Sequence, residues 1–240
     1  TTPPPPPPPP PRDSIRRQRQ MCIRDRAKAH GVPYLLDACQ SVGQMPIDVE
    51  EIGCDLLSAT SRKFLRGPRG TGFLYVRRAM LDHLEPTVLD LHGARWEALD
   101  RFVVRPDARR FELWERSPAL ALGMGRAAAY AMQVGLDEIW DRVTVLGSML
   151  RAALTEVSGV TVRDIGSVQG AIVTFTVDSR EANDVKAALR DQAINVSVVT
   201  PNSARFDMED RQLPDLVRAS VHYFNTEREI ERLVEAVFAL

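Results

Sequence analysis

Two short apolar segments, separated by a helical pattern, place the tightest limits on the fold of this chain. Residues 32–36 form an apolar run that enters Asp37, and residues 55–59 form a second run that precedes Lys63. Between them, residues 49–53 have the pattern of a short helix ended by a glycine. Such alternation is typical of α/β folds with a mainly parallel sheet, so we expect Asp37 and Lys63 to project from neighbouring strand ends toward one crevice.

A carboxylate and an amine placed in this way are the groups that a pyridoxal phosphate (PLP) enzyme needs. The lysine forms an imine with the cofactor aldehyde, and the acid keeps the pyridine nitrogen protonated. A plainer interpretation fits the same residues. Lys63 can be a solvated charge in an arginine-rich loop that binds anions, and Asp37 can be a turn former.

Four further groups of residues extend the cofactor hypothesis. Gln40 can donate its amide to the phenolic oxygen of the ring, while Thr60 and Arg62 offer a hydroxyl and a guanidinium to the phosphate. Glycines follow the lysine closely and allow tight backbone turns there; they are Gly67, Gly70 and Gly72.

Composition excludes several other classes of protein. The chain has 240 residues, of which 44% are hydrophobic and 26% charged, and its formal net charge is -1. These values describe a soluble globular protein. No apolar run approaches the roughly 20 residues that span a bilayer, and the charge balance gives no field for nucleic acid, so neither partner is expected. The three cysteines, Cys22, Cys39 and Cys54, form no paired framework or metal-ligand spacing, which favours a cytoplasmic protein.

Residues 1–26 are set apart from the fold. Pro3 to Pro11 is an unbroken proline run, and residues 12–26 are basic without an apolar face, so we expect disorder. Residues 17–26 resemble a translated sequencing-adaptor read-through, which would mean that the natural N-terminus is missing. A proline-rich ligand for a partner domain and a basic nucleic-acid arm are the alternatives.

The remainder is expected to form two domains, residues 27–135 and 136–240. Residues 85–117 have weak periodicity and are expected to be a long loop. Pro118 is expected to open a helix that ends at Gly135, with Ser117 as its N-cap, and a second helix follows to about Val157. The C-terminal part is expected to be a small α+β domain of the split-βαβ type. Its predicted strands are 160–163, 171–177, 194–199 and 216–223, its helices are 180–192 and 226–238, and residues 200–213 are a loop.

Three segments in order resemble one family. They are Asp37-Ala38-Cys39-Gln40-Ser41-Val42-Gly43, Thr60-Ser61-Arg62-Lys63 followed by Gly67-Pro68-Arg69-Gly70-Thr71-Gly72, and Val217 to Thr226. Together they resemble the class V aminotransferase family of fold-type I PLP enzymes, which includes cysteine desulfurases and isopenicillin N epimerase-like proteins. The resemblance implies a partial large domain followed by the small domain.

The resemblance also implies roles for individual residues. Lys63 would be the imine lysine, Asp37 the partner of the pyridine nitrogen, Gln40 the phenolic-oxygen contact and Arg218 the clamp for the substrate carboxylate. The implied partner is a small-molecule substrate, an amino acid. Members are usually homodimers, and the arginine-rich residues 85–115 are the candidate interface.

Departures from the family pattern narrow the expected chemistry. Arg62 stands where desulfurases commonly carry histidine, residues 200–213 contain no cysteine, and Arg110 to Glu115 replaces a glycine-threonine pair that reaches the partner subunit's phosphate. We therefore do not expect a desulfurase that forms a persulfide. The wording of these segments most resembles the isopenicillin N epimerase-like branch of the family. Aminotransfer and carbon–sulfur lysis stay open, with epimerisation or a non-catalytic truncated remnant as alternatives.

Overall fold

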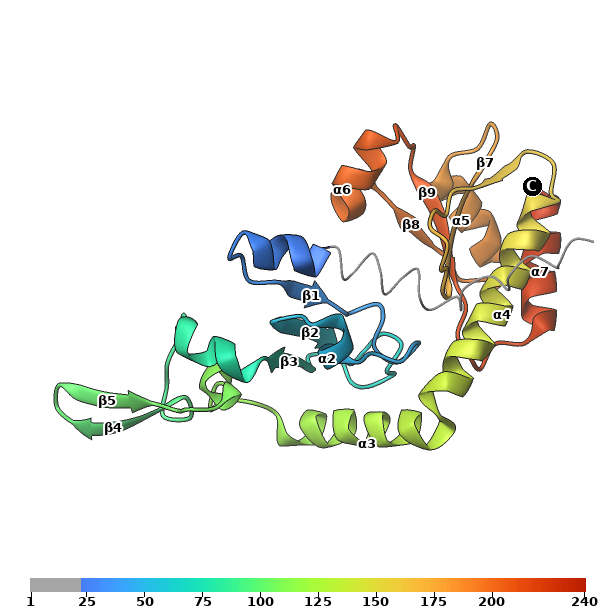
Figure 1. Ribbon diagram of the computed structural model, residues 1–240. Helices are drawn as coiled ribbons and strands as arrows, with labels where there is room; N and C mark the ends of the chain where they lie inside the picture. Colours follow the sequence, from blue (N-terminus) through green and yellow to red (C-terminus); the bar gives the residue numbers. More distant parts are fainter. Residues whose placement is uncertain (1–22) are drawn as a thin grey trace, which may run out of the picture. The chain divides into compact units, whose positions relative to one another are not determined.

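The computed structural model describes residues 23–240, and the chain divides into two compact units (Figure 1). The first unit ends at Leu136 and the second is Asp137–Leu240. Residues 23–29 are helical, so the end of the segment expected to be disordered is ordered; Ala27 and Ala29 favour a helix there. The proline run lies outside the described residues.

A three-stranded sheet with the order β1-β2-β3 forms the centre of the first unit. Its strands are β1 (Leu35–Asp37), β2 (Leu56–Thr60) and β3 (Gly72–Val76). β1 and β2 are parallel, and the helix α2 (Val49–Ile52) lies between them in sequence, with Asp48 as its N-cap and Gly53 at φ 68° as its C-cap. A crossover of this kind is what a parallel pair requires.

The third strand runs in the opposite direction, so the described sheet is mixed rather than mainly parallel. Thr60 pairs with Gly72 and Leu56 with Val76 in an antiparallel register. The physical reason is the connection between the two strands. Residues 61–71 contain no crossover helix, so the chain turns back on itself and pairs along the neighbouring edge.

The core of this sheet is small and lies around β2. Ala38, Cys54, Leu57 and Ala59 are buried, and partly buried apolar side chains pack against them; these are Tyr34, Leu36, Val42, Ile47, Val49, Ile52 and Tyr75. Burying alternate residues of β2 fixes the register of the strand and therefore the position of the loop that follows it.

Residues 85–117, expected to be a loop, contain a β-hairpin. Its strands are β4 (Ala94–Ala98) and β5 (Arg101–Val104), flanked by the short 3₁₀ helices η1 (Arg78–His83) and η2 (Ala108–Phe111). The prediction was wrong because nearly every side chain of the hairpin is exposed. Such strands have no apolar-polar alternation for the sequence to show.

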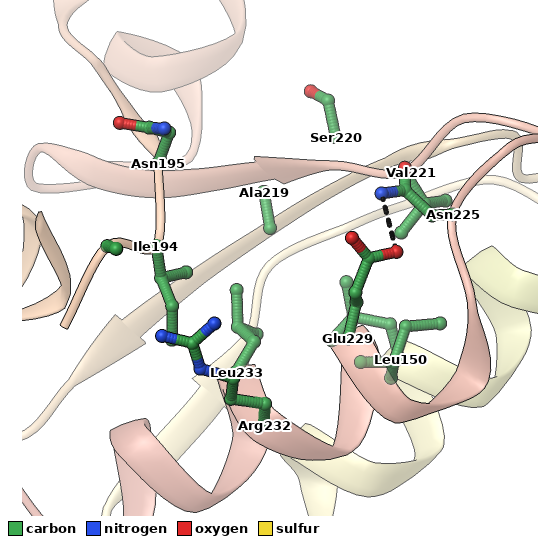
Figure 2. Close-up of a pocket in the computed structure, with 12 residues that line it drawn as sticks. Leu150, Ile194, Asn195, Ala219, Ser220, Val221, Asn225, Glu229, Arg232 and Leu233 are labelled. Atoms are coloured by element: carbon green, nitrogen blue, oxygen red, sulfur yellow. Dashed lines mark hydrogen bonds between the residues drawn. The ribbon is translucent and has the colours of Figure 1, made fainter.

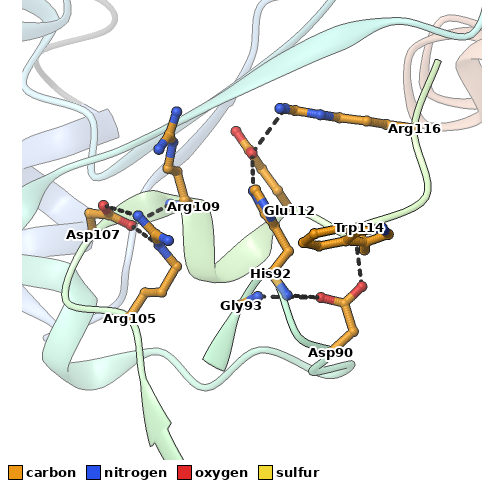
Figure 3. Close-up of polar contacts among 9 residues, drawn as sticks. All are labelled: Asp90, His92, Gly93, Arg105, Asp107, Arg109, Glu112, Trp114 and Arg116. Carbon is orange, nitrogen blue, oxygen red and sulfur yellow. Dashed lines mark hydrogen bonds and ion pairs between the residues drawn. The ribbon is translucent and has the colours of Figure 1, made fainter. Parts of the chain in front are cut away.

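Polar contacts hold the base of this hairpin (Figure 3). Glu112 accepts from Arg116 and pairs with the ring nitrogen Nε2 of His92 at 2.9 Å, and Asp90 accepts from the backbone nitrogens of His92, at 2.7 Å, and Trp114, at 2.6 Å. These bonds join the two ends of the segment. They therefore fix the hairpin without a hydrophobic core.

The long helix α3 (Pro118–Val134) follows and confirms the expected boundaries. Ser117 caps it by accepting from the backbone nitrogen of Leu120, Pro118 occupies its first turn, and Gly135 ends it. The Ser117 side chain pairs with a backbone N–H group that has no partner within the helix, and Pro118 has no such N–H group to pair. Both residues therefore suit the start of a helix.

The second unit is a four-stranded antiparallel sheet with helices. The strand order is β6-β7-β9-β8, with β6 (Val160–Val162), β7 (Ile172–Val177), β8 (Ser197–Val199) and β9 (Leu216–Ser220). The helices are α4 (Leu136–Thr155), α5 (Ala182–Asp191), α6 (Pro201–Asp210) and α7 (Glu227–Phe238). Helix α6 replaces the expected loop. The sequence did not predict it because Met208 is its one buried residue and Ala204 breaks its helical geometry.

A buried ion pair joins α4 to this sheet. The guanidinium of Arg151 donates to Asp164 at 2.6 Å and to the carbonyl oxygens of Gly170, at 2.9 Å, and Ile172, at 2.6 Å. Asp164 also accepts from the backbone nitrogen and the hydroxyl of Thr174. The side chains of Arg151 and Asp164 are only 11% and 9% exposed, so this pair is part of the core.

An exposed ion pair at the start of α7 makes the stability of the second unit depend on pH. Arg142 lowers the pKa of Glu227 from 4.5 to about 2, because its guanidinium donates to the carboxylate at 2.5 Å. A lowered pKa in the folded state means that the stabilisation is complete above pH 4.5 and is lost as the pH falls toward 2. A carboxyl NMR titration is expected to show this midpoint. In Arg142→Ala the midpoint should return toward 4.5, and an unchanged midpoint would contradict the assignment.

Candidate active site

The carboxylate of Asp37 lies at the carboxyl end of β1, where the sequence predicted it. Its oxygen Oδ1 accepts from the backbone nitrogen of Cys39 at 2.9 Å. This hydrogen bond is the largest cause that lowers the pKa of Asp37, and the positive charge of Lys63 lowers it further. Asp37 is therefore ionised at neutral pH and lies within electrostatic range of the lysine.

Lys63 lies three residues beyond the end of the neighbouring strand β2. Its side chain is half-buried, while the two residues after it, Phe64 and Leu65, are buried. The backbone nitrogen of Arg66 donates to the Lys63 carbonyl at 2.9 Å and closes a tight turn in which Arg66 has φ 62°. The lysine is thus carried by a short, anchored loop.

The segments that carry Asp37 and Lys63 touch at Gly43. A Cβ atom at this position would lie 2.3 Å from the Leu65 nitrogen, and Gly43 has φ 90°. Only glycine fits there, both because the backbone is left-handed and because another backbone lies against it. The fold therefore brings the two sequence motifs together directly.

The other residues predicted for the cofactor lie in the same two segments. Gln40 is half-buried in the turn after β1, and its carbonyl accepts from the side chain of Gln44. Thr60 ends β2, and its hydroxyl donates to the Thr71 carbonyl at 3.4 Å. Arg62 is exposed beside Lys63. The structure gathers all three in the first unit with Asp37 and Lys63.

Helix α3 packs on the lysine loop, which explains one of its two glycines. A Cβ atom at Gly123 would lie 2.8 Å from the ring of Pro68, whereas one at Gly125 would meet nothing within 4 Å. Arg66 also lies over the ring of Tyr130, 5.6 Å from its centroid. The helix thus covers the loop on one side.

These two glycines provide a matched pair of substitutions. Gly125→Ala is expected to stabilise the protein by about 0.5–1 kcal/mol, because alanine is the better helix former and the site is open. Gly123→Ala is expected to destabilise it by about 1–3 kcal/mol through the clash with Pro68. Urea denaturation followed by circular dichroism measures both. Equal effects of the two substitutions would show that the helix does not pack on the loop as described.

Arg218 lies on β9 in the second unit, between Thr174 of β7 and Ser197 of β8. Its Nε donates to the hydroxyl of Ser220 at 3.1 Å. Burial lowers the pKa of Arg218, and within residues 23–240 no carboxylate forms an ion pair with it. A partly desolvated guanidinium of this kind favours an anionic ligand.

A cavity of about 280 Å³ lies beside β9 and α7 in the same unit, and the sequence did not indicate it (Figure 2). Apolar side chains such as Leu150 and Leu233 line part of it, and Glu229 accepts from Asn225 at 3.2 Å at its edge. Glu229 also caps α7 together with Thr226. Its carboxylate is thus committed to the fold, and Arg218 does not line the cavity.

Across residues 23–240, no group of three or more histidine, cysteine or acidic side chains could hold a metal ion. In the same part of the chain, every helix is too short or too polar to cross a membrane.

Comparison with known proteins shows the family of this chain. The chain matches the family described as Aminotransferase class-V over residues 18–233, and it belongs to that family. The match begins inside residues 1–26, which were expected to lie outside the fold. The fold is the fold-type I arrangement of PLP-dependent enzymes, present here with a partial large domain.

Among relatives, the probable cysteine desulfurase of Methanothermobacter thermautotrophicus is 29% identical over 212 residues, covering 86% of this chain and 52% of that protein. The apo structure of the cysteine desulfurase from Thermococcus onnurineus NA1 is 27% identical with a TM-score of 0.82, covering 89% of this chain and 53% of that chain. A C-DES variant with glycine linked covalently to its PLP cofactor is 23% identical with a TM-score of 0.72, covering 83% of this chain and 49% of that chain. At that identity the last comparison shows the fold alone.

The chain spans about half the length of the curated relatives that it matches. The curated relatives are named as cysteine desulfurases, so the comparisons lend no support to the expected likeness to epimerases.

For two residues of the lysine loop, Ser61 and Thr71, the sequence predicted no role of their own. A buried serine has no periodic signal, and only its hydrogen bonds reveal it.

Proposed function

We propose that this protein is a PLP-dependent enzyme that acts on an amino acid, either by transferring its amino group or by cleaving a carbon–sulfur bond. One observation carries the proposal. An ionised carboxylate, Asp37, and a half-buried amine, Lys63, lie at the ends of neighbouring parallel strands whose following segments touch at Gly43. The ends of parallel strands are where α/β folds bind ligands.

The residues present fit the cofactor. The backbone nitrogen of Cys39 holds Asp37 in the anionic form, which a cationic pyridine nitrogen requires. Thr60 and Arg62 offer a hydroxyl and a guanidinium for the phosphate, and Gln40 offers an amide for the phenolic oxygen. When bound, PLP supplies an aldehyde that condenses with amines and a ring that accepts electrons from the α carbon.

The chain's own groups would then have distinct tasks. Lys63 would hold the cofactor covalently and afterwards move a proton at the substrate α carbon, since the buried Phe64 and Leu65 that follow it anchor its backbone. Arg218 would bind the substrate carboxylate, for which a planar guanidinium is suited.

The proposal extends to assembly and location. We expect a homodimer in which residues 85–115 contribute to the interface, because the hairpin there exposes Trp96, Leu99 and Phe102. A monomer in sedimentation experiments would contradict this. The free thiols of Cys39 and Cys54 are compatible with the reducing cytoplasm.

Reductive trapping tests the proposal, because the sequence contains only three lysines, Lys28, Lys63 and Lys186. Incubation with PLP, reduction with borohydride and peptide mass spectrometry should place the cofactor on Lys63. Lys28 and Lys186 are exposed and serve as internal references. Equal labelling of all three would favour a non-catalytic remnant that keeps the fold without the cofactor.

Cysteine desulfurase activity is a second candidate, favoured by the names of the relatives. Against it, residues 200–213, which include α6, contain no cysteine to accept sulfur. Product analysis with a panel of amino acids and cysteine conjugates separates the candidates. A keto acid with an aminated acceptor indicates transamination, and pyruvate, ammonia and a thiol indicate lysis. Alanine with a persulfide on the protein would indicate desulfuration.

A further inference from the structure

A buried pair of hydroxyl groups closes the loop that carries Lys63. The Ser61 hydroxyl donates to the Pro68 carbonyl at 2.6 Å, and the Thr71 hydroxyl donates to the same oxygen at 2.9 Å. The two hydroxyl oxygens also contact each other. The two hydroxyl groups have two protons for these three contacts, and only one proton can lie between the two hydroxyl oxygens. At least one hydroxyl therefore always donates to the Pro68 carbonyl.

Backbone bonds and packing reinforce this closure. The nitrogen of Ser61 donates to the Thr71 carbonyl at 3.0 Å, and the nitrogen of Gly67 donates to the Ser61 carbonyl at 2.7 Å. A Cβ atom at Gly67 would lie 2.8 Å from that of Ser61. Ser61 is 0% exposed, so water cannot replace a hydrogen bond that it loses.

The closure lies directly next to the lysine. Ser61 stands two residues before Lys63, and the buried Phe64 and Leu65 follow it and pack against Gly43. The backbone of Lys63 is therefore held on both sides. A long, flexible side chain reacts at a fixed place only if its backbone is held in this way.

Resting on the proposed function, we propose that Ser61 and Thr71 are positioning residues that hold Lys63 for reaction with the cofactor aldehyde. Their hydroxyl groups act through the Pro68 carbonyl and do not touch the cofactor. The relevant variants are Ser61→Ala, Thr71→Val and the double variant. Thr71→Ser keeps the hydroxyl and should behave as the parent protein does.

Two measurements on the full chain test the proposal. The rate of borohydride trapping of PLP at Lys63, relative to Lys186, is expected to fall about tenfold in the double variant. The rate of acylation of Lys63 by acetic anhydride without PLP is expected to rise about threefold, because a loosened loop exposes the amine. The free energy of unfolding of each variant, measured by urea denaturation, separates these changes from general destabilisation, which would also expose Lys63.

A matched control variant removes a threonine hydroxyl that lies far from Lys63 in the sequence. Thr155 donates to the Arg151 carbonyl at 2.8 Å in the second unit, and Thr155→Val should leave both rates at Lys63 unchanged. If the double variant fails to fold, the comparison of Thr71→Val with Thr71→Ser still decides. Equal rates in these two variants would overturn the proposal.

The acylation rate separates this proposal from the proposed function. If the parent protein shows no preference for Lys63 in trapping, but the variants still raise acylation of Lys63, then the cofactor assignment fails and only the anchoring of the lysine loop by Ser61 and Thr71 stands. If trapping prefers Lys63 and neither rate changes in the variants, then the positioning role fails and the cofactor assignment stands.

Discussion

Lys63→Ala is expected to reduce turnover of the amino-acid substrate by about 10⁴-fold, the largest factor associated with one proton-transferring group. The substitution also removes the amine that would hold the cofactor, so the visible absorbance of bound PLP should be lost. Absorbance spectra and steady-state product assays measure the two effects. Loss of both together is expected only if Lys63 itself reacts.

Two further variants make this result specific. Lys63→Arg keeps a positive charge near Asp37, yet a guanidinium cannot replace the amine, so it should lose as much activity. Lys186→Ala removes an exposed lysine from α5 and should behave like the parent protein. Activity retained in Lys63→Arg would mean that the lysine acts only through its charge, as in the plainer anion-binding interpretation.

Asp164→Ala is expected to destabilise the second unit by about 3–5 kcal/mol, the range for breaking a buried ion pair from one side. The substitution leaves the buried guanidinium of Arg151 without its carboxylate, and it also removes the acceptor for Thr174. Hydrogen exchange of peptides from α4 and β7, followed by mass spectrometry, reports the stability of this unit alone.

An exposed ion pair in the same unit serves as the control. Arg205 pairs with Glu209 on α6, and both side chains are more than half exposed, at 59% and 58%. Glu209→Ala should change the stability by no more than about 0.5 kcal/mol. The double variant Arg151→Met with Asp164→Ala should recover part of the loss, because no buried charge then remains. A loss below 1 kcal/mol in Asp164→Ala would show that Arg151 reaches water.

Much of the fold could be predicted where apolar periodicity or a helix cap is strong. The boundaries of α3, the glycine end of α2 and the strand and helix order of the second unit are as expected, apart from α6. The hairpin β4–β5 and helix α6 could not be predicted, since they bury few side chains. The antiparallel direction of β3 could not be predicted either, because it depends on how the loop of residues 61–71, which contains no helix, turns back along β2.

For the candidate site, the sequence alone determined which chemical groups are available and that Asp37 and Lys63 each lie at or just beyond the end of a strand. These are local facts, because they depend on residue type and on periods of two to four residues. The tertiary structure decided that the two segments meet at Gly43, that Ser61 and Thr71 close the lysine loop, and that Arg151 pairs with Asp164. Such contacts join residues many positions apart, and their energies depend on burial and distance, which a linear pattern does not record.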